Sequence, residues 1–221
     1  MDNFNGFDGF IFDLDGTLAD SNGVWEKIDR KILERNHVYL TDKQLKAAAA
    51  MSYDEILAFF ASHGITMSSD ELKTEMNELA VKEYRYNIFL KSGVKEYLKL
   101  LKENGKKIAL ATASPKTLYE PVLRNNCVYG LFDAFVTTDE VGAEKDFPDI
   151  YLTAAEKLEC FPDRCVVFED VLKGIVSAKN AGMYTVAVYD EYSSADFVTM
   201  RNMADSFIMS FDEMPLAAGR L

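Results

Sequence analysis

The chain has 221 residues, 48% of them hydrophobic, so it can bury the core of one large domain or of a domain with a smaller insert. Its net charge of −12 argues against a broad nucleic-acid interface, which needs a basic surface. No apolar run approaches the about 18–20 residues that cross a bilayer, and no basic segment followed by a long apolar stretch opens the chain, so we expect a cytoplasmic protein.

Short apolar runs recur along the chain and alternate with segments of helical periodicity. Each run is rich in Ile, Val, Phe or Ala, as strands buried on both faces are. The predicted strands are Phe7–Phe12, Lys107–Ala113, Ala134–Thr138, Cys165–Glu169, Tyr184–Val188 and Ser206–Met209. Strands that alternate with helices predict parallel crossovers and a three-layer, doubly wound, Rossmann-like α/β core.

One region, from about Val24 to Phe89, contains no convincing strand. Helices are expected there at Val24–Arg35, Asp42–Ala50, Tyr53–His63 and Ser69–Asn87. We therefore predict two domains: an α/β core formed by residues 1–21 and 89–221, and an all-helical domain, residues 22–88, inserted after the first strand.

Polar side chains follow several predicted strands at the point where each strand ends. These residues are Asp13 and Asp15, Thr112, Lys145, and Glu169 with Asp170. Open parallel sheets bind ligands beyond the carboxyl ends of their strands, so we expect these side chains to converge at one edge of the sheet.

Such a gathering of carboxylates predicts a metal and a phosphate. Crowded carboxylates repel one another, and Mg²⁺, which prefers oxygen ligands, relieves that repulsion. A lysine and a hydroxyl beside the metal suit a phosphate group. One carboxylate could then attack the phosphorus and form an aspartyl-phosphate, while a second moves protons. Gly16 would let the chain turn sharply after Asp15.

These residues resemble the four signature motifs of the haloacid dehalogenase superfamily of phosphohydrolases. Asp13-Leu14-Asp15-Gly16-Thr17 corresponds to the first motif, and Thr112, Lys145 and Glu169-Asp170 correspond to the others. The stretches "KDFPDIYLTAAEKL" and "VVFEDVLKGIVSAKNAGM" resemble the β-phosphoglucomutase-like branch. The helical insert is similar to the cap domain of that branch.

The resemblance implies a role for each matching position. Asp13 would be the nucleophile and a Mg²⁺ ligand, and Asp15 the general acid/base whose main-chain carbonyl also reaches the metal. Asp170 would bind the metal, with Glu169 bound directly or through water. The phosphoryl group would be held by Thr112, Lys145 and the main-chain N–H groups of Leu14, Asp15 and Ala113. Trp25 and Tyr53 are candidate substrate-facing residues of the cap.

The leading interpretation is a Mg²⁺-dependent phosphatase that acts on a small phosphorylated metabolite, such as a sugar or polyol phosphate. The alternative is a phosphosugar mutase. The mutase has a histidine near the position of Trp25 and an arginine on a cap loop, where this chain reads Met51-Ser52-Tyr53-Asp54, and this departure favours a phosphatase. A phosphonatase with Lys27 or Lys31 as a Schiff base, and a non-enzymatic binding protein, are further alternatives.

Taken singly, some of these residues have ordinary structural explanations. Asp15-Gly16 is also typical of a hairpin turn, Asp170 of a helix N-cap, and Lys145 of a solvated loop. The cysteines, Cys127, Cys160 and Cys165, lack metal-type spacing, and we expect reduced thiols that lie mostly in or near the core. We expect a monomer that binds neither nucleic acid nor membrane.

Overall fold

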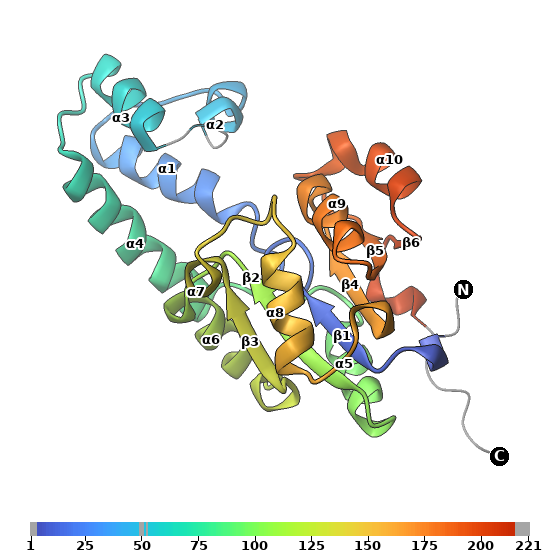
Figure 1. The fold of residues 1–221 in the computed structure, drawn as a ribbon. Helices are drawn as coiled ribbons and strands as arrows, with labels where there is room; N and C mark the ends of the chain where they lie inside the picture. Colours follow the sequence, from blue (N-terminus) through green and yellow to red (C-terminus); the bar gives the residue numbers. More distant parts are fainter. Residues whose placement is uncertain (1–3, 49–50, 52, 215–221) are drawn as a thin grey trace. The chain divides into compact units, whose positions relative to one another are not determined.

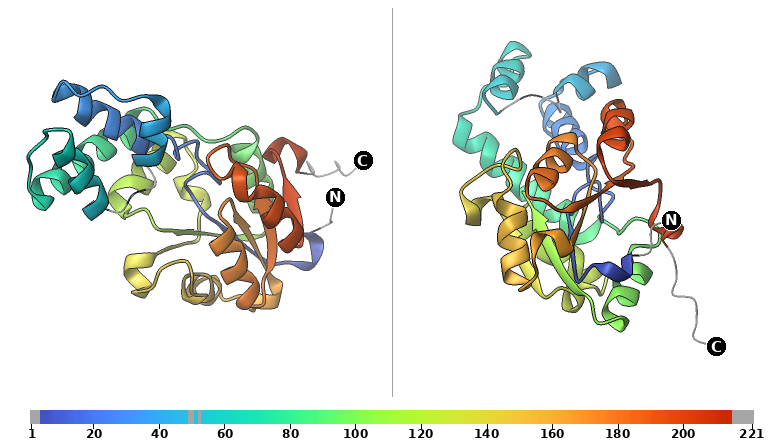
Figure 2. Two further views of the ribbon diagram at one scale, coloured as in Figure 1. Left: turned by 90° about the horizontal axis from the view of Figure 1, so that it is seen from above. Right: turned by 45° about the vertical axis from the view of Figure 1, so that its right-hand side comes forward.

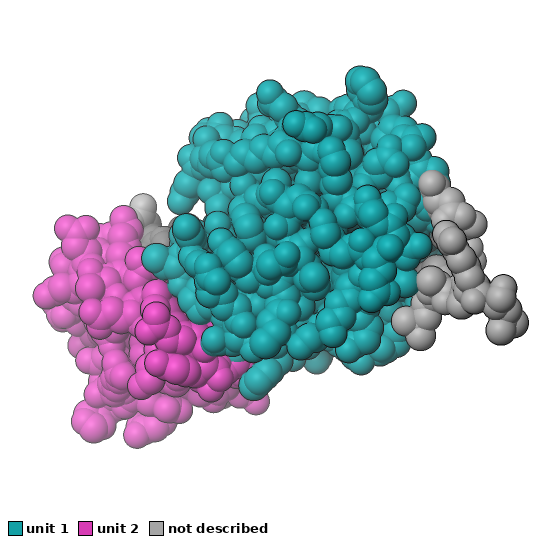
Figure 3. Space-filling view, turned by 90° about the horizontal axis from the view of Figure 1, so that it is seen from below, with its two compact units in different colours: residues 1–21, 88–221 teal, residues 22–87 magenta. Residues whose placement is uncertain are grey.

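The computed structural model describes residues 4–48, 51 and 53–214. The chain divides into two compact units, which we call the core unit (residues 1–21 and 88–221) and the helical unit (residues 22–87). Figure 3 colours them teal and magenta. Among the described residues, every helix is too short or too polar to cross a membrane.

The core unit is built on a six-stranded sheet in which all neighbouring strands pair in parallel, in the order β3-β2-β1-β4-β5-β6 (Figure 1). The strands are β1 Gly9–Phe12, β2 Lys107–Thr112, β3 Ala134–Thr137, β4 Cys165–Glu169, β5 Tyr184–Val188 and β6 Ser206–Ile208. The predicted strands and the doubly wound α/β class are confirmed. The first strand begins at Gly9, later than predicted, because Phe7 packs against the rings of Phe4 and Tyr184 outside the ladder.

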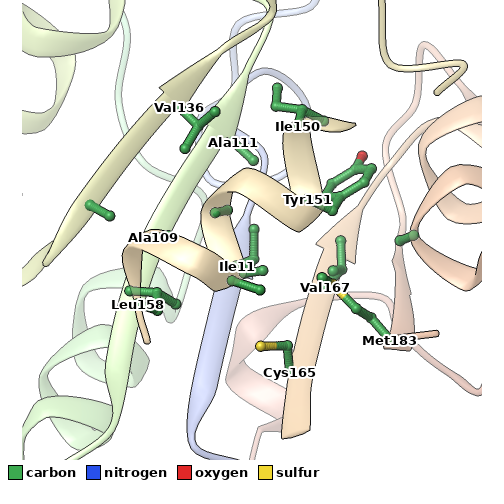
Figure 4. Packing of buried hydrophobic residues seen from close by; sticks show 14 residues of the cluster. Ile11, Ala109, Ala111, Val136, Ile150, Tyr151, Leu158, Cys165, Val167 and Met183 are labelled. Carbon is green, nitrogen blue, oxygen red and sulfur yellow. The ribbon is translucent and has the colours of Figure 1, made fainter. Parts of the chain in front are cut away.

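Helices cover both faces of this sheet (Figures 1 and 2). The core unit contains the helices α5 Val94–Glu103, α6 Lys116–Asn125, α7 Thr138–Val141, α8 Asp149–Lys157, α9 Leu172–Asn180 and α10 Ser194–Met203, and the short 3₁₀ helices η1 Phe4–Gly6, η2 Tyr129–Leu131, η3 Pro162–Arg164 and η4 Phe211–Glu213. Ile11 of β1 packs with Ile150 and Tyr151 of α8 (Figure 4). Phe12, the next residue, points to the opposite face and meets Tyr97 of α5. This alternation makes three layers, because successive residues of a strand face opposite sides of the sheet.

The helical unit consists of α1 Val24–Arg35, α2 Asp42–Ala48, α3 Tyr53–Ser62 and α4 Ser69–Tyr86. These bounds match the four predicted helices to within about one residue at each described end, and residues 49–50 of the second prediction lie outside the described residues. A capping box, in which Ser68 and Glu71 each bond the other's backbone N–H, starts α4. The ammonium of Lys31 on α1 bonds the buried carboxylate of Glu83 on α4 and lowers the pKa of Glu83.

The connectors that lead out of and back into the core unit lie side by side. The N–H of Asp20 donates to the carbonyl of Phe89 at 3.0 Å, and the N–H of Lys91 donates to that of Leu18 at 2.9 Å. Ala19 and Leu90 form an antiparallel bridge between these two bonds. The two ends of the insert are therefore fastened together on the core unit.

The cysteines are all free thiols. Cys165 is buried and Cys160 is half-buried, as predicted for residues in or near the core, whereas Cys127 is exposed. Cys127 follows α6 with a positive φ of 59°, in the loop before η2, and there its side chain points away from the core.

Candidate active site

The predicted site residues follow the carboxyl ends of neighbouring central strands. β1 ends at Phe12, directly before Asp13, and it lies between β2, which ends in Thr112, and β4, which ends in Glu169. Lys145 comes from the segment between α7 and α8. The prediction that these side chains converge is confirmed for Asp13, Lys145 and Glu169, because the ammonium of Lys145 contacts both carboxylates.

The ammonium of Lys145 lies between two carboxylates. Its Nζ atom is 2.5 Å from Oδ1 of Asp13 and 2.5 Å from Oε1 of Glu169, and the side chain of Lys145 is only 12% exposed. Burial lowers the pKa of Lys145, but the charges of Asp13 and Glu169 outweigh burial and raise it above its usual value. The alternative of a solvated loop lysine is therefore wrong.

Three buried carboxylates share this place. Oxygen atoms of Asp13, Glu169 and Asp170 all lie within 4.8 Å of one another, a separation that suits a shared metal ion. Burial raises the pKa of Asp13 well above its usual value; Lys145 opposes this, and Glu169 and Asp170 add to it. Three carboxylates around one ammonium leave an excess of negative charge, so the cluster favours either a bound cation or a bound proton.

Glu169 is held by hydrogen bonds on both of its oxygens. Oε1 also accepts from the hydroxyl of Tyr151 at 2.8 Å, and Oε2 accepts from the N–H groups of Asp170 and Val171 at 3.1 and 3.3 Å. Figure 4 shows the ring of Tyr151 against the core cluster with its hydroxyl at the end nearer the strand tips. The buried tyrosine therefore fixes the carboxylate that Lys145 contacts.

Asp170 is oriented by Thr17 of the first motif, and it is not the N-cap residue of α9. Its Oδ1 atom accepts a hydrogen bond of 2.9 Å from the hydroxyl of Thr17. The N-cap of α9 is Val171, and no side-chain capping bond is present there. The alternative in which Asp170 only caps a helix is wrong, and the Thr17 contact joins the ends of β1 and β4.

Asp15 accepts hydrogen bonds from two serine hydroxyls. Its Oδ1 atom is 2.6 Å from the hydroxyl of Ser21, and its Oδ2 atom is 2.6 Å from the hydroxyl of Ser114. Gly16 has a φ of 80°, which confirms the sharp turn expected after Asp15. β1 and β2 pair in parallel, so this turn is not the hairpin of the alternative explanation.

The other predicted phosphate contacts lie at the same edge. Thr112 is fully buried, and its hydroxyl oxygen accepts from the N–H of Ser114 at 3.0 Å. Leu14 is buried directly after Asp13, and Ala113 is exposed directly after β2. Their roles toward a phosphate stay predictions.

The two candidate substrate-facing residues, Trp25 and Tyr53, belong to the helical unit. Trp25 is half-buried in α1 of the helical unit. The side chain of Tyr53, with its neighbours Ser52 and Asp54, lies outside the described residues. The substrate-facing role of Trp25 and Tyr53 stays a prediction.

Four residues that orient the site were not predicted from the sequence. Thr17 lies inside the first motif, and Ser114 follows Thr112 by two residues, so closeness to a predicted site residue could have pointed to both. Ser21 lies farther from the strand end. Tyr151 reads as an apolar position of α8, and only its hydroxyl contact reveals its second role.

The chain resembles known hydrolases over most of its length. The family model for haloacid dehalogenase-like hydrolases matches residues 10–188. A protein named phosphorylated carbohydrates phosphatase from Thermotoga maritima is 29% identical over 174 residues, which cover 78% of this chain and 81% of that protein. Hexitol phosphatase B from Escherichia coli is 28% identical over 181 residues, which cover 80% and 82% of the two chains. A solved structure of a "putative beta-phosphoglucomutase" from Thermotoga maritima superposes with a TM-score of 0.81 at 27% identity and covers 91% of this chain and 94% of its own.

Proposed function

Because the chain belongs to the haloacid dehalogenase-like hydrolases, we propose that it is a phosphatase that hydrolyses a phosphate monoester of a small metabolite through an aspartyl-phosphate on Asp13. The observation that carries the proposal is the contrast between two aspartates one residue apart. Asp13 lies in a buried charged cluster with Lys145, whereas Asp15 is bound by two hydroxyls. The two carboxylates are thus set up for different tasks.

The cluster suits a hard divalent cation, and we propose Mg²⁺. The donors are carboxylate oxygens, which Mg²⁺ prefers, and a cation would balance the excess negative charge around Lys145. Asp13, Asp170 and the main-chain carbonyl of Asp15 would hold the ion. Both oxygens of Glu169 already accept hydrogen bonds, so we propose that Glu169 acts through bound water. When bound, Mg²⁺ would neutralise charge that develops on the phosphoryl oxygens.

The reaction would run in two halves at Asp13. In the first, a carboxylate oxygen of Asp13 attacks the phosphorus, the bond to the ester oxygen breaks, and the carboxyl of Asp15 gives that oxygen a proton. In the second, a water molecule gives a proton to Asp15 and attacks the same phosphorus, and the bond to Asp13 breaks. Inorganic phosphate leaves, and both aspartates return to their starting states. Lys145 and Thr112 would hold the phosphoryl oxygens.

The serine pair around Asp15 fits a group that changes protonation twice per cycle. A hydroxyl can donate to a carboxylate or accept from a carboxylic acid. Ser21 and Ser114 are each 2.6 Å from one oxygen of Asp15, so either serine can turn its proton as Asp15 gains or loses its own. The carboxyl group is kept in place in both states.

We propose a sugar or polyol phosphate as the substrate class, and residues 22–88 as the cap that selects it. Support comes from relatives named for phosphorylated carbohydrates and for hexitols. Trp25 and Tyr53 remain our candidates for contact with the part of the substrate that leaves. We also propose a monomer in the cytoplasm, with the free thiols as support for a reducing compartment.

A screen of phosphorylated metabolites with Mg²⁺, read as phosphate release, tests the activity. Asp13→Asn should reduce turnover of any hydrolysed ester by at least about a thousandfold, as expected for loss of a nucleophile. Asp163→Asn is the matched control, because Asp163 is exposed in η3 at the amino end of β4 and its change should leave turnover intact. Wild-type turnover by Asp13→Asn would contradict the mechanism.

A phosphosugar mutase is the second candidate, favoured by the similarity to the solved structure with the mutase name. A mutase must return the phosphoryl group to a second position of the sugar. A coupled assay with β-glucose 1-phosphate separates the two activities. Glucose 6-phosphate as the product would support the mutase, and release of inorganic phosphate alone would support the phosphatase.

A further inference from the structure

The side chain of Lys91 connects three parts of the core unit. Lys91 lies on the connector that returns from the helical unit. Its ammonium donates to the carbonyl oxygen of Gly16 and, at 2.9 Å, to that of Tyr189 after β5. It also forms an ion pair of 2.8 Å with Oδ2 of Asp190. An ammonium has three donors, and three acceptors surround this one.

The contact with Gly16 bears on the turn that carries Asp15. Gly16 has a positive φ, and its N–H donates to the carbonyl of Ala19 at 2.9 Å, so both ends of this residue are bonded. The Gly16 carbonyl belongs to the peptide group that also includes the N–H of Thr17, whose hydroxyl bonds Asp170. The turn is therefore held at two neighbouring residues, at Gly16 by Lys91 and at Thr17 by Asp170.

The connector does not need this side chain for its own attachment. Backbone bonds already join Asp20 to Phe89 and Lys91 to Leu18. The ammonium adds a bond that reaches past the connector to Gly16 and to the end of β5. The side chains of Lys91 and Asp190 are only 19% and 5% exposed, so solvent competes little for the contact. Oδ1 of Asp190 accepts from the N–H of Tyr192 at 3.0 Å, which fixes the partner carboxylate.

We propose that Lys91, backed by Asp190, is a positioning residue for Asp15. It holds the Gly16 turn so that the Asp15 carboxyl meets the leaving oxygen of the ester. This role rests on the proposed function, in which Asp15 moves the protons. It predicts that loss of the ammonium harms the proton-transfer task of Asp15 more than it harms phosphate binding.

The test compares kcat/KM for two esters in the wild type, Lys91→Met and Asp15→Asn. One ester is p-nitrophenyl phosphate, whose leaving group needs little protonation, and the other is the alkyl phosphate turned over fastest in the screen. General acid catalysis is worth about 10²–10⁴-fold, so partial misplacement of Asp15 should cost the alkyl ester about tenfold more than the aryl ester. Asp15→Asn should show the same bias, only larger. Equal losses for both esters, or no loss, would overturn the proposal.

Lys102→Met is the control, because it removes another lysine–aspartate pair, to Asp133 at 2.7 Å, at the opposite end of the strands. It should show no bias between the esters. Amide hydrogen exchange of the 14–20 segment gives a readout independent of turnover. Lys91→Met should speed this exchange about tenfold, and unchanged exchange would refute the role even if the wild type hydrolysed no ester. If Lys91→Met does not fold, Asp190→Asn should show the same bias more weakly, and its absence would refute the proposal.

Discussion

Replacement of Asp29 by asparagine should remove a loss of stability that the helical unit suffers as the pH rises. Asp29 lies on the buried face of α1 with Val24, Ile28 and Ile32. It is 1% exposed, and within the described part of the chain its Oδ1 atom has no hydrogen-bond partner. Burial first, and then the charge of Glu26, raise the pKa of Asp29 from 3.8 to about 7. The folded protein therefore binds a proton that the unfolded chain releases.

The sign and size of the effect follow from these two pKa values. Below pH 3.8 the carboxyl is protonated in both states and costs nothing. As the pH rises towards 7, only the unfolded chain loses the proton, so the free energy of unfolding falls. Between pH 5 and pH 8 the loss from this one group is about 2.5 kcal/mol, at about 1.4 kcal/mol per tenfold change in proton affinity. Asp29→Asn cannot titrate, so its stability relative to the wild type should rise by that amount over the same range.

Urea unfolding at pH 5 and pH 8 measures the difference directly. Trp25, the single tryptophan of the chain, lies one helical turn before Asp29 and reports the unfolding of this unit by fluorescence. Asp70→Asn is the control, because Asp70 is exposed in the first turn of α4 and its change should have the same effect at both pH values. The result that would refute the reasoning is a difference in the free energy of unfolding, Asp29→Asn minus wild type, that changes by less than about 0.5 kcal/mol from pH 5 to pH 8. A substitution at an exposed site commonly changes stability by that much.

Two further predictions concern the charged cluster. Lys145→Met leaves the carboxylates of Asp13 and Glu169 buried without their cation, and should lower the free energy of unfolding by about 3–5 kcal/mol in EDTA. Millimolar Mg²⁺ should restore part of that loss. Near-ultraviolet circular dichroism during urea unfolding measures the stability in EDTA and with Mg²⁺. A loss under about 1 kcal/mol in EDTA would count against a buried ion pair. Gly174→Ala places a Cβ atom 2.5 Å from the carboxyl carbon of Glu169 and 2.8 Å from the Tyr151 hydroxyl, so it should displace Glu169. We expect about 2 kcal/mol or more of destabilisation, together with a lower apparent affinity for Mg²⁺ in turnover assays, and wild-type behaviour in both would contradict the packing.

Strand positions were predictable because the sheet is parallel and buried on both faces. Such strands are short continuous apolar runs, and β4 and β5 begin and end where the composition changes. The start of β1 was less predictable. Phe7 is as apolar as the strand, but it joins an aromatic group with Phe4 and Tyr184, a tertiary contact that local sequence does not encode.

The contact of Lys145 with Asp13 and Glu169 was predictable from the sequence, whereas the hydrogen bonds that orient the carboxylates were not. The rule that ligands bind beyond the carboxyl ends of parallel strands is enough to select Asp13, Lys145 and Glu169 from the sequence. The roles of the Ser21 and Tyr151 hydroxyls were not predicted, because their hydrogen bonds to Asp15 and Glu169 are formed only in the folded chain. The contact of Lys91 with Gly16 was not predicted for the same reason, since the two residues are 75 positions apart in the chain.

Because the two connectors are paired, we expect that residues 22–87 can be replaced without a change in the strand order of the sheet. Asp20 and Phe89 are hydrogen-bonded neighbours, so a short turn could join the connectors directly, and a longer or different insert could begin and end at the same two points. We therefore expect that the sequence of the insert can change, in evolution or in the laboratory, without a change in the residues at the strand ends. A chimaera that carries another helical insert between these connectors would exchange one module while it kept the carboxylates, the lysine and their supporting hydroxyls intact.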